Sequence, residues 1–491
     1  MAILVPTRVY TTLLFEGLDH WVAAFLVPLA VWIAISGLDD LFITLVRFAT
    51  CRVRFPWPSD ADAYGAAERP IAVFVPLWRE HAVIGRMLEH NLAAIQYRNY
   101  HFFVGVYPND VLTTCAVAEQ ARRHPRVHIA TCPHDGPTSK GDCLNWIYQR
   151  MKDHEARHDM RFRIVVMHDA EDLIHPESFR LINWFSRRYA MVQVPVLPLP
   201  TALGEWTHGL YCDEFAEYQH KDIPVRQHLG GFLPSNGVGT GFDREALERL
   251  AGTRRGRPFD PACLTEDYET GYLLHSLGYR QVFVPVRTGA AGPMATREYF
   301  PRRFRPAIAQ RTRWVTGIAL QSWQRHGWSA PWPQLYWFWR DRKGLVGNLL
   351  SPAANLFFLY GTASYLASLG QPAPWHFGSL LPTWISDICC LTFGIALLQT
   401  GVRAGSGARI YGWRFAAAVP IRMFWGNLVN FAATAIALWE FWSARTSGRD
   451  LVWRKTDHVY PVAPQPALAA NAVGFHPIAD ASAIAVVRES Y

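Results

Sequence analysis

The sequence predicts an α/β domain, with a doubly wound and mainly parallel sheet, inserted between transmembrane helices. First, short apolar runs alternate with amphipathic segments between residues 71 and 196, as in the repeated units that build parallel sheets. Second, long apolar segments flank this region on both sides. Third, 14% of the residues are aromatic, including 20 Trp, which is rich for a soluble enzyme and indicates a mixed membrane and soluble chain.

Charge and cysteine content narrow the classes of function. The net charge is +8, and no run of Lys and Arg with interleaved aromatic residues indicates a nucleic-acid partner. Positive charge beside apolar segments is instead typical of membrane topology. The eight cysteines show no CxxC pairs or regular spacing, which argues against a structural zinc site or a disulfide framework and fits a reducing compartment.

The first transmembrane segment is expected within residues 1–50. Residues 21–37 are uncharged and nearly long enough to span a bilayer, and residues 38–48 extend them past Asp39 and Asp40 at the interface. A cleaved signal peptide is the alternative, but the basic region is weak and no small-residue cleavage site follows. The positive-inside rule places the N-terminus outside and the next segment in the cytoplasm, because three arginines follow, Arg47, Arg52 and Arg54.

The α/β pattern begins after a polar, proline-containing linker at residues 55–70. We assign residues 51–330 to a cytoplasmic domain with interfacial helices. Strands are predicted at residues 71–76, 102–107, 127–131, 163–168 and 191–196, and helices at 82–95, 111–124, 141–151 and 176–189. The pattern is less regular from there to about residue 295.

The C-terminal region, residues 331–442, is expected to hold transmembrane and interfacial helices. Residues 344–369 and 379–400 are apolar and long enough to cross. Residues 415–442 are expected to lie in the interface or re-enter, because basic residues flank both ends and polar residues interrupt the run, with Pro420, Arg422, Gly426 and Asn427. This gives three full crossings, with four as the alternative. Residues 443–491 are expected to form a cytoplasmic tail, weakly ordered from about residue 460.

A buried strand that ends in three carboxylates is the centre of the predicted site. Residues 164–167 are apolar, and Asp169, Glu171 and Asp172 follow them. Ligands bind at the carboxyl ends of parallel strands, and carboxylates at this spacing can gather around Mg²⁺ or Mn²⁺. Such a cation could hold the diphosphate of a nucleotide. The alternative is a helix start, with an aspartate capping it and Glu171 in its first turn.

Two further polar positions follow other predicted strands and loops. Asp110, preceded by Asn109, comes after the second strand, where a pair of turn residues is the simpler interpretation. Lys140 follows a loop containing Gly, Pro and Ser, and either contacts phosphate or is a solvated lysine.

Thr265-Glu266-Asp267 precedes a helix-like segment, residues 268–277. A capping box is the alternative to a functional role. The functional interpretation is a carboxylate that projects into a cleft and takes a proton from a hydroxyl group.

A second helix, expected to begin at Pro306, carries Gln310, Arg313 and Trp314. Their spacing places the three on one face, where an amide, a bidentate anion binder and an aromatic ring suit a diphosphate and a sugar. Upstream, basic and aromatic residues alternate and predict a membrane-surface element, with Tyr299, Phe300, Arg302, Arg303, Phe304 and Arg305.

These motifs together resemble family 2 membrane glycosyltransferases, of which the cellulose and hyaluronan synthases are familiar members. That family shows D, DxD, TED and QxxRW in order, as do Asp110, Asp169-Ala170-Glu171, Thr265-Glu266-Asp267 and residues 310–314. The resemblance covers roughly residues 20–460. Within the family, YPND, HDAED, SNGVGTGF and residues 453–456 most resemble the inner-membrane glycosyltransferases of the phage adsorption protein B type.

The resemblance implies a GT-A-like fold and assigns roles to residues. Asp110 would contact the nucleoside, Asp169 and Lys140 the nucleotide-sugar, and Asp267 would be the general base. Metal would be held by Asp169 with Glu171 or Asp172, because this sequence has Glu at the second DxD position and Asp beside it. Diphosphate and acceptor contacts would come from the remaining motif residues, Gln310, Arg313, Trp314 and Glu266, and from the loop at residues 235–241, including Gly239.

The implied activity is an inverting transfer of a sugar from a nucleotide-sugar, expected to be a UDP-sugar, to a growing polysaccharide. One base and no protein nucleophile imply a single displacement. The alternatives are a single-sugar transferase acting on a lipid-linked acceptor, and an inactive receptor or scaffold. The expected location is the bacterial inner membrane, in contact with lipid, with the catalytic domain in the cytoplasm. The number of crossings is low for an enzyme that forms its own channel, which favours a partner protein that completes the export path of the product.

Overall fold

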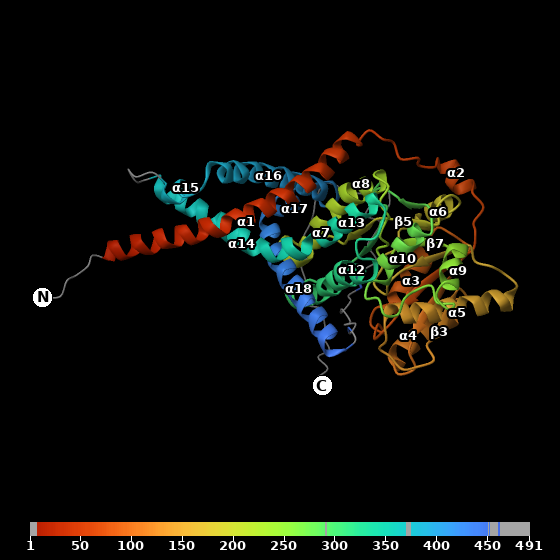
Figure 1. The fold of residues 1–491 in the computed structure, drawn as a ribbon. Coiled ribbons are helices and arrows are strands. Elements are labelled where there is room, and N and C mark those ends of the chain that lie inside the picture. Colours follow the sequence, from red (N-terminus) through yellow and green to blue (C-terminus); the bar gives the residue numbers. More distant parts are fainter. Residues whose placement is uncertain (1–6, 290–291, 370–374, 450, 452–459, 462–491) are drawn as a thin grey trace.

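The computed structural model describes residues 7–289, 292–369, 375–449, 451 and 460–461 (Figure 1). The predicted C-terminal tail, residues 443–491, lies mostly outside the described residues, as does the motif at residues 453–456.

A seven-stranded sheet forms the centre of the α/β domain, in the order β3-β2-β1-β4-β7-β5-β8. Its strands are β1 Ile71–Pro76, β2 Tyr100–Val106, β3 Val127–Thr131, β4 Ile164–Met167, β5 Met191–Gln193, β7 Thr240–Asp243 and β8 Gln281–Phe283. Every pairing is parallel except those of β7, which runs antiparallel to both β4 and β5. The prediction of a mainly parallel sheet is confirmed.

Helices cover both faces of this sheet, as expected for a doubly wound domain (Figure 1). The alternating side chains of β1 enter two different cores: Val73 and Val75 pack on one face, and Ala72 and Phe74 on the other. The first core receives apolar residues from α3 Ile84–Ala94, α4 Val111–Arg123 and α6 Ser178–Phe185. The second receives them from α5 Lys140–His158, α9 Arg244–Gly252 and α10 Glu266–Ser276.

The predicted strand at residues 191–196 is divided into two. β5 ends at Gln193, and β6 Val196–Pro198 instead pairs with β11 Thr296–Glu298 in a separate two-stranded sheet. Pro195 explains the break, because it has no backbone N–H to continue the ladder of the main sheet.

The region described from sequence as irregular contains well-formed helices. They are α7 Trp206–Glu217, the π-helical turn η1 Tyr218–Asp222 and α8 Ile223–His228. Residues 207–213 of α7 are buried without interruption, so the helix shows no alternation between polar and apolar faces. Periodicity cannot identify a helix that is buried on all sides.

Three helices among the described residues are long and apolar enough to cross a membrane. They are residues Gly17–Ala49 of α1 (Thr7–Ala49), α16 Thr383–Tyr411 and α18 Val419–Ser447. These helices indicate an integral membrane protein.

The three helices that could cross a membrane are not the same three segments that the sequence predicts to cross. Residues 415–442 were expected to lie in the interface or to re-enter. Most of them form the continuous helix α18, whose length and composition would allow a crossing. Pro420 does not interrupt this helix because it lies in the first turn, where no N–H is needed. Residues 344–369 form α14 Gly344–Ser368, a helix with interior polar residues and Pro352 that is not among the three.

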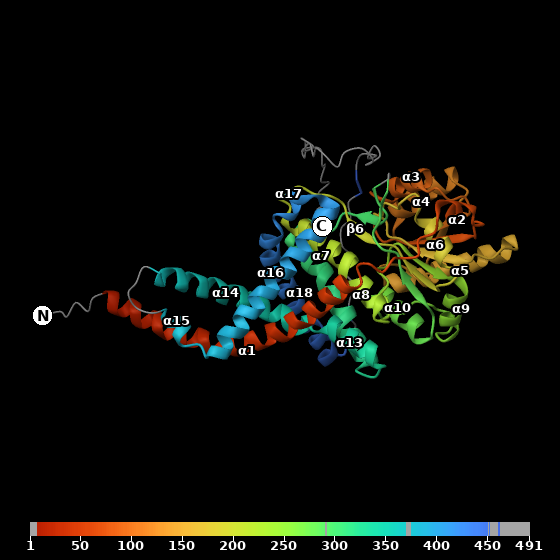
Figure 2. The same cartoon turned by 90° about the horizontal axis from the view of Figure 1, so that it is seen from above.

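The α/β sheet lies at one end of the long helices, and α1 and α14 extend away from it in both views (Figures 1 and 2). Arg340 of α13 Trp332–Arg342 fixes α1 to the domain by ion pairs with Asp39, Asp40 and Asp222. Lys343 adds contacts of 2.7 Å to both α1 aspartates.

Short elements complete the described chain. They are α2 Asp60–Gly65, β9 Thr288–Gly289, β10 Gly292–Pro293, α11 Phe304–Trp314, η2 Val315–Gln321, α12 Ser322–His326, α15 His376–Ser379 and α17 Trp413–Ala416.

Candidate active site

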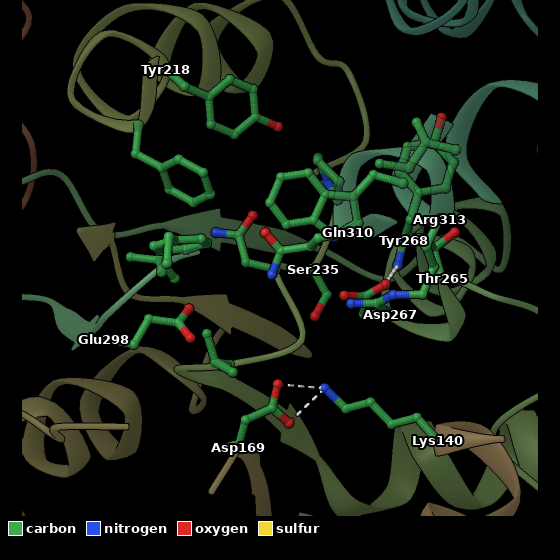
Figure 3. Close-up of a pocket in the computed structure, with 18 of the residues that line it drawn as sticks. Lys140, Asp169, Tyr218, Ser235, Thr265, Asp267, Tyr268, Glu298, Gln310 and Arg313 are labelled. Carbon is green, nitrogen blue, oxygen red and sulfur yellow. Dashed lines mark hydrogen bonds and ion pairs between the residues drawn. The ribbon is translucent and has the colours of Figure 1, made fainter. Parts of the chain in front are cut away.

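A cavity of about 760 Å³ opens at the carboxyl ends of β1 and β4, where ligands bind in parallel sheets (Figure 3). Segments that are far apart in the sequence converge on it. Its lining includes most of the residues selected from sequence, namely Lys140, Asp169, Glu171, Asp267, Gln310, Arg313 and Trp314.

The turn after β4 separates the three predicted metal-binding carboxylates. Asp169 and Glu171 line the cavity, whereas Asp172 is fully buried and lies outside the lining. Its Oδ2 is 2.6 Å from His168 Nδ1 and accepts a 3.0 Å hydrogen bond from the backbone N–H of Asp169. Burial lowers the pKa of His168 to about 3, so a neutral imidazole donates to Asp172. The placement does not support Asp172 as a ligand, because the residue is used to hold the turn.

Lys140, at the start of α5, points across the cavity to Asp169 (Figure 3). Its Nζ lies 2.7 Å from Asp169 Oδ1 and 2.9 Å from Oδ2. Burial alone would lower the pKa of Lys140, but the carboxylates of Asp169, Glu266 and Asp267 outweigh it and raise that pKa overall. The lysine is therefore a fixed positive charge beside the carboxylates.

Glu298, on β11, is a site residue that sequence reasoning missed. It lines the cavity near Asp169 and is 9% exposed (Figure 3). Burial, followed by the charges of Asp172 and Asp169, raises its pKa well above the usual range. Its sequence context gave no signal, because Thr296 and Arg297 precede it and β11 is defined by pairing with the distant β6.

The cavity floor, formed by Asp169, Glu171 and Glu298, fits a hard divalent cation by its chemistry. Carboxylate oxygens are the ligands that Mg²⁺ and Mn²⁺ prefer. Two further carboxyl groups, those of Glu171 and Glu298, line the same cavity. Asp169 is balanced by Lys140. The lysine thus offsets part of the negative charge that a bound cation would otherwise offset.

Asp267 enters the cavity from the first turn of α10, while its neighbour Glu266 is buried outside the lining. Burial raises the pKa of Asp267, and the positive charges of Lys140 and Arg313 oppose this rise. Burial and the charge of Asp267 raise the pKa of Glu266 to about 7. The capping-box alternative is wrong, because the side chain of Thr265 makes no capping hydrogen bond.

A glycine permits the close approach of backbone to Asp267. Gly237 has φ +74°, and a Cβ placed on it would lie 2.6 Å from Asp267 Oδ2 and 3.4 Å from Lys140 Nζ. The loop at residues 235–241 therefore lies at the site, as expected. Gly239, the residue selected from sequence, packs against Val194 and Thr296 and is outside the lining.

Helix α11 presents Gln310, Arg313 and Trp314 to the cavity on one face, as predicted. The helix begins at Phe304 rather than Pro306; proline in the first turn is tolerated because those N–H groups have no helical partner. Arg311 points elsewhere and pairs with Glu214 at 2.6 Å.

The predicted membrane-surface element is exposed at residues 302–305 but not at Phe300. Phe300 is 5% exposed and lies 4.9 Å from Tyr211 and 6.4 Å from Trp314, measured between ring centroids. The prediction of a membrane-surface element is therefore wrong for Phe300, which supports Trp314 and lines the cavity.

Asp110 is the one predicted nucleotide contact outside the cavity lining. It caps α4 by accepting a hydrogen bond from the Thr113 N–H, and it also accepts one from the Arg79 N–H at 2.5 Å. This placement matches the alternative of a turn residue, because a carboxylate after a strand and before a helix satisfies the free N–H groups of the helix.

The cavity extends from the sheet to the long helices. At that end its lining includes Asp40 of α1, Gln399 and Arg403 of α16, and Met423 of α18. Lys221 lies 3.2 Å from Gln399 Oε1 and 2.5 Å from a carboxylate oxygen of Glu217. The interior space therefore connects the carboxylates at the sheet to helices that are able to cross a membrane.

Sequence comparison matches residues 68–317 to the model of glycosyltransferase like family 2. Over 463 residues the chain is 37% identical to bacteriophage adsorption protein B of Escherichia coli K12 and to bacteriophage N4 adsorption protein B of E. coli O157:H7. These alignments cover 89% of this chain and 62% of each relative. The chain thus spans less than two thirds of the length of the curated relatives it matches.

Solved structures give more distant similarities. A mannosyltransferase from Pyrobaculum calidifontis in complex with GDP-Man and Mn²⁺ has a TM-score of 0.49 and 20% identity, over 84% of this chain and 99% of that one. Glucosyl-3-phosphoglycerate synthase from Mycobacterium tuberculosis, with Mn²⁺ and UDP, has a TM-score of 0.31 and 16% identity, over 52% and 81%. These similarities are too distant to assign a donor, a metal or an acceptor to this chain.

Proposed function

The chain belongs to glycosyltransferase like family 2, and we propose that this glycosyltransferase moves a sugar from a UDP-sugar onto a growing polysaccharide at the membrane. One observation carries the proposal: a single cavity brings together Lys140, Asp169, Asp267 and Arg313 from four distant segments. The set provides carboxylates, a base and two cations, as transfer from a sugar diphosphate requires.

The donor would bind with its diphosphate between the floor carboxylates and α11. Asp169 and Glu171 would hold Mg²⁺ or Mn²⁺, with Glu298 beside them. When bound, the cation supplies Lewis-acid stabilisation of the leaving diphosphate. Arg313 presents a bidentate guanidinium to phosphate oxygens, and Lys140 adds a positive charge whose position is fixed by Asp169.

Asp267 would accept the proton of the acceptor hydroxyl. Its burial favours the role, because a carboxylate with a raised pKa is a stronger base. The hydroxyl oxygen then bonds to the anomeric carbon as the bond from that carbon to the diphosphate oxygen breaks. With one base and no protein nucleophile the displacement is single, so an α-linked donor gives a β-linked product.

The acceptor would approach from the membrane end of the cavity. Trp314, Phe300 and Phe215 line the space there and offer apolar surfaces to sugar rings. The extension of the cavity to α16 and α18 also supports a second candidate, transfer of one sugar to a lipid-linked acceptor. The length of the product separates the two: repeated addition gives a ladder of products, and single transfer gives one.

Location and export remain part of the proposal. The three arginines after the first span favour a cytoplasmic catalytic domain by the positive-inside rule. The small number of candidate spans favours export through a partner protein. A fluorescent reporter fused next to the catalytic domain, compared with one fused to the turn before α16, would test the orientation.

The test of the activity is nucleotide release by the detergent-purified chain. A panel of UDP- and GDP-sugars would be supplied with Mn²⁺ or Mg²⁺, with and without a chelator and a saccharide acceptor. We expect release from one donor that requires metal. Absence of both release and donor binding, measured by calorimetry, would contradict the proposal.

A further inference from the structure

Three histidines meet at the edge of the sheet, away from the cavity. They are His101 of β2, His128 of β3 and His154 of α5, and each offers a ring nitrogen within 4.8 Å of the other two. His101 Nδ1 and His128 Nε2 are 2.8 Å apart, with the two rings stacked. The His154 ring centroid is 4.4 Å from that of His128 and 5.3 Å from that of His101.

The cluster is separate from the proposed catalytic cation. His101 and His128 lie at the amino-terminal ends of their strands, whereas the cavity is at the carboxyl ends of β1 and β4. Along α5, His154 is fourteen residues beyond Lys140, a distance of about 21 Å at the rise of an α-helix. A ligand held by these rings would not touch the donor.

The histidine rings are neutral, which is the protonation state that binds metal. His154 is 6% exposed, and among the described residues its imidazole makes no hydrogen bond, although its backbone carbonyl accepts one from His158. Burial, followed by the neighbouring histidines, lowers the pKa of His128 and of His154 to about 4. The rings are therefore neutral at pH 7, with lone pairs available.

We propose that His101, His128 and His154 bind a divalent transition metal of the Zn²⁺ class. Imidazole nitrogens suit zinc, and the absence of carboxylates from the three-residue set disfavours Mg²⁺ and Ca²⁺. A tetrahedral site with Zn–N bonds of about 2.0–2.1 Å leaves a fourth position for water or another histidine. The exposed His158 stacks on His154, with ring centroids 4.1 Å apart, and lies outside the three-histidine set, so we expect water at that position.

Two nearby arginines weaken metal binding by the histidines but do not prevent it. Arg126 lowers the pKa of His101 and Arg157 that of His128, each less than burial does. Arg126 stacks on the Tyr100 ring at 5.0 Å, and Arg157 is exposed, so solvent screens its charge. A bound metal would join α5 to β2 and β3. It would act on stability, since no residue of the cavity belongs to the cluster.

The experiment uses the full chain in detergent, purified with a histidine-free tag, and measures metal content and melting temperature. We expect about one Zn²⁺ per chain that survives dialysis, and a lower melting temperature after chelation that Zn²⁺ restores. His128→Gln should lose the zinc, whereas His124→Gln, at the neighbouring end of α4, should keep it. Donor-dependent nucleotide release should stay the same in both variants. Equal zinc content in the wild type and His128→Gln would overturn the proposal.

Cobalt titration of the wild-type chain keeps the test independent of how the variants fold. Tetrahedral Co²⁺ with nitrogen ligands absorbs in the visible range, whereas octahedral Co²⁺ at a carboxylate site absorbs weakly. We expect a visible band that Zn²⁺ abolishes and that excess Mg²⁺ leaves unchanged. Absence of the band, or its loss with Mg²⁺, would overturn the proposal while leaving the glycosyltransferase assignment intact.

Discussion

Replacement of Gly237 by alanine tests whether the position of Asp267 controls turnover. The new Cβ would lie 2.6 Å from Asp267 Oδ2, whereas ordinary contacts begin at 3.4 Å. The carboxylate must therefore move by about 0.8 Å, the difference between the two distances. A displacement of about 1 Å in an active site can lower the rate by about 10²-fold. We expect kcat to fall by about 10–100-fold.

A matched control separates this effect from backbone strain. Gly278 has φ +83°, and a Cβ added there meets nothing within 4 Å. Both alanine variants should lose about 1–2 kcal/mol of stability, because a side chain is strained in the left-handed region. Only Gly237→Ala should lose turnover, measured as single-turnover donor consumption with UDP binding followed by calorimetry. Equal rates in the two variants would show that the position of Asp267 does not control turnover.

Three other predictions concern the carboxylates and their partner lysine. Lys140→Met should lower kcat in the nucleotide-release assay by about 10²–10³-fold, because a charge beside the leaving group is lost; an unchanged kcat would exclude this role. Asp169→Asn should weaken Mn²⁺ binding, followed by electron paramagnetic resonance, more than Asp172→Asn does; the reverse order would contradict the placement of Asp172. Glu266 has a folded pKa of about 7, above its ordinary value of 4.5, so its contribution to stability is present below pH 4.5 and is lost as the pH rises through 7. Glu266→Gln should therefore lose less stability than the wild type between pH 5 and pH 8 in denaturant titrations; parallel curves would contradict this.

Strands β1 to β5 were predictable because they are short apolar runs with clear ends, whereas β7 and β8 lie in the region that was expected to be less regular. The predicted bounds of β1 and β3 match the structure. Helix α7 was missed because burial on all sides removes the polar face that periodicity detects. The continuity of α18 was not predicted, because Pro420 and three polar or small residues interrupt the apolar run in the sequence, whereas in the structure the proline lies in the first turn.

The candidate site was partly predictable because rare combinations of side chains occur at the ends of elements. Asp169, Asp267 and Arg313 are such residues, and all three line the cavity. The same signal also selected Asp110, which caps a helix, because capping and ligand binding both use carboxylates at these positions. Glu298 was missed because its strand exists only by tertiary pairing.

The most direct test of Asp267 as the general base is turnover by Asp267→Asn compared with UDP binding by the same protein. Asparagine keeps the size of the side chain and removes the basic oxygen. We expect turnover to fall by about 10²–10⁴-fold, the usual contribution of a general base, while the dissociation constant for UDP stays at the wild-type value. Turnover at the wild-type rate would contradict the assignment of Asp267 as the base, and with it the proposed single displacement.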